Sequence, residues 1–100
     1  MEDSPLSFDI QVGDAGTVRL SGRLDAAQAD QALATLNALP GPLVLDCAGL
    51  EYISSAGLGV IVATYKRLLA AGSAFRLVNL GPRVGNVFAL SGLDKVIPIG

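Results

Sequence analysis

The segment that most constrains the fold is a strand-length apolar run followed by a short loop and the start of an amphipathic helix. The apolar run occupies residues 42–47, and two adjacent serines, Ser54 and Ser55, stand where the helix is expected to begin. Strand, loop and helix in this order predict an α/β fold in which a helix over 55–71 covers a sheet. Apolar side chains recur in this helix every three or four positions, the spacing of a single buried face: Leu58, Ile61, Val62, Tyr65 and Leu69.

The serine pair has two interpretations. Serine is a favoured N-cap residue, because its hydroxyl accepts a hydrogen bond from a free N–H group of the first helical turn. The same position places a hydroxyl beside the positive end of the helix dipole, where a phosphate or another anion is stabilised. From the residues alone, Ser54 and Ser55 either only cap the helix or form a site that holds a phosphate or another anion.

The composition indicates one soluble domain, residues 1–100, with an aliphatic core. Apolar residues make up 51% of the chain and aromatic residues only 5%. A net charge of −2 without a basic cluster argues against nucleic acid as the main partner. The longest apolar stretch, residues 60–65, is too short for membrane insertion, and the acidic N-terminus lacks the positive start of a signal peptide. We therefore expect a cytoplasmic protein.

The residue types present argue against catalysis. The sequence contains no histidine, which removes Ser-His-Asp and Cys-His arrangements and histidine-based zinc sites. Cys47 is the single cysteine, so we expect neither a disulfide framework nor a thiolate metal site. Asp25, Asp46 and Glu51 have no metal-ligand spacing and no accompanying base. We expect no enzyme activity, no cofactor and no metal.

The whole chain predicts the element order ββαβαβαβ, with a mixed, mostly parallel sheet and helices packed on it. Asp25 is a natural N-cap for the first helix. The apolar strand over 43–47 is expected to be buried on both faces, with Asp46 at its C-terminal end. There Asp46 would hold the loop through backbone N–H groups or contact a partner. Pro98 places the last strand at the edge of the sheet. The expected strands are 6–12, 17–22, 43–47, 74–79 and 96–99, and the expected helices are 26–38, 55–71 and 82–91.

Two glycines in the first turns of the second helix are unfavourable for helix formation. Gly57 and Gly59 each cost roughly 1 kcal/mol relative to alanine. A cost of this kind indicates that another group approaches the helix closely. That group is either a strand of the core or a partner protein.

Residues 53–58, Ile-Ser-Ser-Ala-Gly-Leu, resemble the phosphorylation loop of STAS domains, in particular that of bacterial anti-sigma-factor antagonists. In that family the phosphoacceptor is the serine two positions before the glycine, which implies Ser55 here. Ser54 replaces the usual aspartate and becomes the second candidate acceptor. Residues 22–25 and 88–93 also resemble the family, although Arg23 stands where an acidic residue is more usual. The resemblance covers nearly the whole chain, but the family's C-terminal helix after the last strand is absent from this sequence.

The resemblance implies a STAS fold and a regulatory binding function. The unphosphorylated chain would bind an anti-sigma factor that is also a serine kinase, and phosphorylation of Ser55 with ATP would release it. A phosphatase of the PP2C type would reverse the modification. The alternative is a non-enzymatic STAS subunit of a lipid- or anion-transport complex, whose loop contacts an ATPase or permease. The implied partner-binding and loop residues are Asp25, Asp46, Tyr52, Ser54, Ala56, Gly57 and Leu58.

Overall fold

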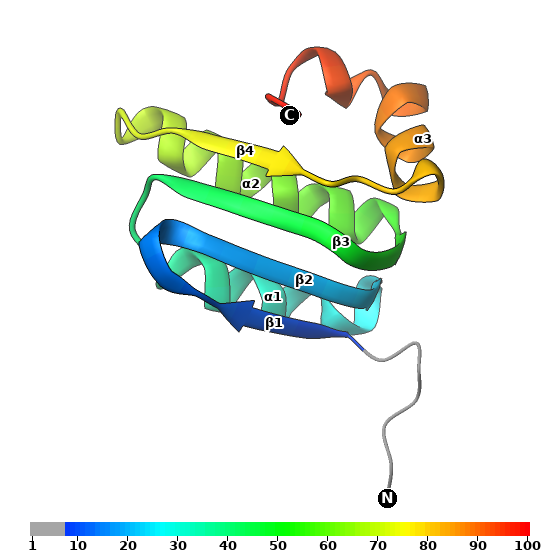
Figure 1. The fold of residues 1–100 in the computed structure, drawn as a ribbon, viewed down its shortest axis with the longest axis horizontal. Coiled ribbons are helices and arrows are strands. Elements are labelled where there is room, and N and C mark those ends of the chain that lie inside the picture. The colour runs from blue at the N-terminus through cyan, green and yellow to red at the C-terminus, as the bar shows by residue number, and fades with distance from the viewer. Residues whose placement is uncertain (1–7) are drawn as a thin grey trace, which may run out of the picture.

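The computed structural model describes residues 8–100 as a four-stranded mixed sheet with two helices on one face (Figure 1). The strand order is β1-β2-β3-β4, with the first pair antiparallel and the other two pairs parallel. Of the expected first strand, Leu6 and Ser7 lie outside the described residues. The mixed, mostly parallel sheet and its covering helices confirm the predicted fold class.

The hairpin of β1 (Asp9–Val12) and β2 (Thr17–Leu24) is joined by a tight turn, Asp14–Gly16. Gly16 has φ +80°, and a Cβ atom at this position would clash with the carbonyl oxygen of Pro42. Only glycine fits there, because both the backbone conformation and the close approach exclude a side chain. The predicted turn is confirmed, and it fixes the start of β2 against the start of β3.

The third strand is longer than expected. β3 runs from Leu43 to Ile53, whereas the sequence suggested a strand that ends at Cys47 and then a loop. The prediction was wrong because the small residues after Cys47 stay paired with β2 through two register shifts. Gly49 lies so close to that strand that a Cβ atom would sit 2.9 Å from Ser21 Cβ. The extension adds Leu50 and Ile53 to the core.

One face of the sheet is covered and the other is not. Helices α1 (Ala26–Asn37) and α2 (Ser55–Ala70) lie behind the sheet in Figure 1. Leu45 is fully buried beneath them, while Val44 and Asp46 point to the opposite face and are partly exposed. The expectation that this strand is buried on both faces was therefore wrong, because no described helix covers the second face. We call this second face the open face.

The C-terminal part closes the β4 edge of the sheet. β4 (Phe75–Val78) is followed by α3 (Pro82–Ser91), which ends at Gly92 with φ +77°, and by a short 3₁₀ turn, Leu93–Lys95. The expected strand over 96–99 is reduced to a single parallel bridge between Leu77 and Ile99. This prediction was wrong in extent because the helical turn continues to Val96 and because Pro98 has no N–H group for a ladder. Its predicted place at the sheet edge is confirmed.

Candidate functional site

The candidate site lies where two parallel strands end and two helices begin side by side. β2 leads into α1 and β3 leads into α2. Because these strands are parallel, both helices begin at the same end of the sheet, the carboxyl end of the two strands (Figure 1). The backbone N–H of Ser54 donates to the carbonyl oxygen of Leu24 at 3.0 Å and ties the two starts together. In open α/β sheets, binding sites gather at this carboxyl end of the strands.

The two serines differ in what they do. Ser54 is the N-cap of α2, and its Oγ accepts a hydrogen bond from the N–H of Gly57 at 3.2 Å. Ser55 is the first helical residue, and its side chain is exposed. The hydroxyl of Ser54 is engaged in the cap, while Ser55 is exposed at the positive end of the helix. The structure thus assigns the cap to Ser54 and leaves Ser55 as the accessible hydroxyl.

The two glycines of α2 also have different environments. A Cβ atom on Gly57 would lie 2.6 Å from the carbonyl oxygen of Leu24 and 2.7 Å from Ile53 Cγ1. The sequence predicted that some group approaches Gly57 closely, and that group is the end of β2, within the fold. Gly59 is exposed, and a Cβ atom there would meet nothing within 4 Å. The described part of the fold gives no steric reason for glycine at position 59.

Asp25 follows Leu24, the residue whose carbonyl oxygen accepts the hydrogen bond from the N–H of Ser54. Its Oδ1 accepts a hydrogen bond from the N–H of Ala27 at 3.1 Å and caps α1. Its Oδ2 lies 3.7 Å from Nε of Arg23, and the guanidinium carbon of that arginine stands 4.0 Å from the centre of the Tyr52 ring. Tyr52 is thereby brought to the same surface. Sequence reasoning missed this contact, because Arg23 and Tyr52 are register partners and register depends on the strand pairing.

Ala56 and Leu58 complete the surface around Ser55. Both are partly exposed in the first turns of α2, and Leu58 also packs against the core. Its N–H donates to the carbonyl oxygen of Ser54 at 2.8 Å, the first backbone bond of the helix. We call the residues around the start of α2 the α2 start surface: Arg23, Asp25, Tyr52, Ser55, Ala56 and Leu58.

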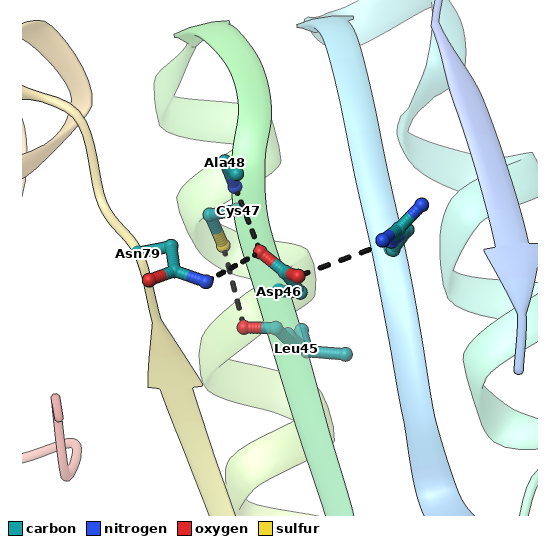
Figure 2. Close-up of polar contacts among 6 residues, drawn as sticks. Leu45, Asp46, Cys47, Ala48 and Asn79 are labelled. Carbon is teal, nitrogen blue, oxygen red and sulfur yellow. Dashed lines mark hydrogen bonds and ion pairs between the residues drawn. The ribbon is translucent and has the colours of Figure 1, made fainter. Parts of the chain in front are cut away.

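Asp46 is not part of this surface. Asp46 lies within β3, because the strand continues beyond it to Ile53. At the usual rise per residue, Asp46 is roughly 20 Å from that end of the strand. Figure 2 shows its carboxylate accepting hydrogen bonds from the backbone N–H of Ala48 and from the side-chain amide of Asn79, each at 3.0 Å. Nε of Arg19 on β2 lies 3.9 Å from Oδ2 of Asp46. Asp46 therefore joins β3 to the segment after β4.

These contacts set the acidity of the carboxyl group. The hydrogen bond from Asn79, followed by that from the Ala48 N–H and the charge of Arg19, holds the pKa of Asp46 below its ordinary value of 3.8, against the opposing effect of desolvation. Asp46 is thus a charged structural group on the open face.

Cys47 does not have the environment of a reactive thiol. Its side chain is buried on the helix-covered face and points to the carbonyl oxygen of Leu45 at 3.7 Å (Figure 2). Burial, with a smaller contribution from the negative charge of Asp46, raises the pKa of the Cys47 thiol to about 12. Residues 8–100 contain no group of three or more His, Cys, Asp or Glu side chains arranged to hold a metal ion. In the same range, no helix has the length and apolar character needed to cross a membrane.

Comparison with known proteins identifies relatives across nearly all of the chain. A family model described as "Mlab, STAS domain" matches residues 8–98. The chain is 34% identical over 89 residues to the anti-sigma F factor antagonist of Paenibacillus polymyxa, covering 82% of this chain and 74% of the relative. It is 32% identical over 91 residues to the anti-sigma-B factor antagonist of Bacillus subtilis, covering 91% and 81%. A crystal structure of an anti-sigma factor antagonist from Mycobacterium paratuberculosis superposes with a TM-score of 0.85 at 31% identity, covering 98% of this chain and 89% of that chain.

Proposed function

Because this chain belongs to the STAS domain family, we propose that it is an anti-sigma-factor antagonist controlled by phosphorylation of Ser55. The observation that carries the proposal is the division between the serines: Ser54 caps α2, and Ser55 is exposed beside it. The names of relatives that are 32–34% identical support the same class of function. In this role the unphosphorylated chain binds an anti-sigma factor that is also a serine kinase.

The geometry suits a switch that acts on the interface and preserves the fold. A phosphate on Ser55 adds about −1.5 to −2 charges at pH 7. The N-terminus of α2 stabilises an anion, and the cap made by Ser54 does not involve the modified hydroxyl. The partner, in contrast, meets added bulk and a charge that must be desolvated on contact. Phosphorylation is therefore expected to release the partner while the domain stays folded.

The remaining parts of the cycle follow from this role. The kinase transfers phosphate from ATP to Ser55, and a phosphatase of the PP2C type removes it. The chain itself acts as a binding module without enzyme activity, in the cytoplasm where sigma factors act. Ser54 is the second candidate acceptor, but its modification would remove the cap hydroxyl from the N–H of Gly57. We therefore rank Ser55 first.

The test combines phosphate mapping with binding. After incubation with an anti-sigma-factor kinase of the same organism and ATP, intact mass and peptide mapping are expected to show one phosphate on Ser55. The Ser55→Ala variant is expected to gain none. Ser55→Asp is expected to weaken kinase binding at least about tenfold, whereas Ser55→Asn, of equal size but neutral, is expected to bind more tightly than Ser55→Asp. Binding that is equal for both variants would contradict the charge-based switch.

A second function is favoured by the residue at position 54. The serine that replaces the usual aspartate caps the helix and adds no negative charge beside the acceptor. This pattern suits a STAS subunit of a lipid- or anion-transport complex, whose α2 start surface contacts an ATPase or permease without phosphorylation. No phosphate in the mapping experiment, together with a stable complex with a transport ATPase, would replace the first proposal by this one.

A further inference from the structure

A second feature of the α2 start surface is a positively charged side chain, Arg23, that is restrained by two neighbouring side chains. The guanidinium of Arg23 lies over the ring of Tyr52, with 4.0 Å from the guanidinium carbon to the ring centre. On one side its Nε stands 3.7 Å from Oδ2 of Asp25. Among the described residues, nothing accepts a hydrogen bond from its two terminal nitrogens. The side chain remains 37% exposed.

This arrangement reduces what a partner must contribute to order the arginine. A free arginine side chain loses much rotational entropy when it is fixed in one geometry. Here the tyrosine ring and the aspartate restrict the side chain before any partner arrives, and the terminal N–H groups stay available. Arginine is enriched among the residues that dominate protein–protein affinity, and a side chain that is ordered before binding loses less entropy when the partner arrives.

The position of Arg23 connects it to the serine site. Leu24, the next residue, accepts the hydrogen bond from the N–H of Ser54, so the end of β2 lies directly against the start of α2. The side chain of Arg23 lies on the open face, whereas α2 begins behind the sheet, so a partner that contacts both Arg23 and Ser55 must cover the carboxyl ends of β2 and β3. The negative charge that pairs with Arg23 is Asp25, whose Oδ2 lies beside Nε of the arginine.

We propose that Arg23 is a specificity-determining residue whose terminal N–H groups donate hydrogen bonds to a carboxylate side chain of the partner protein. A guanidinium presents its N–H groups in a planar fork that matches the two oxygens of a carboxylate. The partner's acidic side chain binds the terminal nitrogens, while Asp25 and Tyr52 keep the fork in place. This inference rests on the proposed function, because it requires a partner that binds over Ser55.

The test measures affinity for the anti-sigma-factor kinase that the unmodified chain binds, by calorimetry. Arg23→Glu is expected to weaken binding roughly 10- to 100-fold, since it removes a charge-assisted hydrogen bond and places like charges opposite each other. Arg23→Lys is expected to lose less affinity than Arg23→Glu, because lysine keeps the positive charge but not the planar fork of N–H groups. In the Arg23→Glu background, a lysine in place of the partner's acidic residue is expected to restore affinity.

Arg19 provides the matched control. It lies on the same strand and the same face, forms an ion pair with Asp46, and is roughly 13 Å from Arg23 along the strand. Arg19→Glu is expected to change affinity by less than about threefold. Circular dichroism and thermal melts of each variant confirm that the fold is intact.

The outcomes separate this inference from the proposed function. If Arg23→Glu binds as tightly as the unmodified chain while Ser55→Asp does not, the carboxylate contact is refuted and the switch stands. If Arg23→Glu changes only the phosphorylation rate and not the affinity, Arg23 serves the nucleotide or phosphate, and the proposal is also refuted. If Ser55→Asp leaves affinity unchanged, the proposed function itself fails. The inference is supported if Arg23→Glu weakens binding of the kinase and if a lysine in place of the kinase's acidic residue restores that binding.

Discussion

The two glycines of α2 are expected to respond to alanine with opposite signs. Alanine is favoured over glycine by roughly 1 kcal/mol at a helix interior position. Gly59 has open space around the added methyl group, so Gly59→Ala is expected to raise the free energy of unfolding by about 0.5–1 kcal/mol. For a domain of this size, 1 kcal/mol raises the melting temperature by about 4–8 °C.

At Gly57 the same methyl group meets the core. It would lie 2.6 Å from a backbone oxygen and 2.7 Å from a buried side-chain carbon. Because the oxygen belongs to the end of β2, it moves only if the junction of β2 and α1 moves. Overpacking of this kind costs about 1–3 kcal/mol, which exceeds the gain in helix propensity. Gly57→Ala is therefore expected to lower the free energy of unfolding by up to about 2 kcal/mol.

The assay is urea unfolding followed by circular dichroism, with melting temperatures as a second measure. Gly85→Ala on α3 is the control, because its methyl group would make an ordinary 3.8 Å contact with Leu80 Cβ. It is expected to stabilise the protein as Gly59→Ala does. If Gly57→Ala is as stable as Gly59→Ala, the close contact with Leu24 does not constrain the helix, and the steric reasoning is refuted.

Three further predictions concern single side chains. Ser54→Ala is expected to lose about 1 kcal/mol of stability in urea unfolding because it removes the cap, whereas Ser55→Ala is expected to change it by less than about 0.5 kcal/mol. Nη2 of Arg67 donates to the carbonyl oxygens of Leu36 and Leu39, both at 2.9 Å. Arg67→Met is therefore expected to lower the free energy of unfolding by about 2–4 kcal/mol in the same assay. The folded-state pKa of Asp46 is lowered, so its contribution to stability is present above the ordinary value of 3.8 and is lost as the pH falls through the folded-state value. The stability advantage over Asp46→Asn is therefore expected to shrink below about pH 4 in a series of urea titrations, and an advantage that is constant with pH would contradict this.

Local interactions made most helices and the serine pair predictable from the sequence. The predicted start of α2 and its N-cap type are confirmed, because capping depends on residues within one turn. Asp25 as the cap of α1 and Gly92 as the end of α3 are confirmed for the same reason. The STAS fold expected from residues 53–58 is confirmed by the match of a family model to residues 8–98.

Strand extents and the contents of the candidate site depended on the tertiary structure. The small residues after Cys47 have the composition of a loop, yet they form strand because β2 lies beside them with shifted register. This extension moves Asp46 away from Ser55 and places it with Asn79 on the open face. Sequence spacing could not show either result, because it contains no information on which strand is the neighbour.

The sequence by itself determined that a serine pair begins a helix after a strand, since helix periodicity and capping are properties of adjacent residues. Only the tertiary structure decided which serine is accessible and which groups surround it. Arg23 meets Tyr52 through the register of two parallel strands, and Gly57 is required because the end of β2 lies against α2. Both contacts join residues that are about thirty positions apart, and only the packing of the sheet brings such residues together.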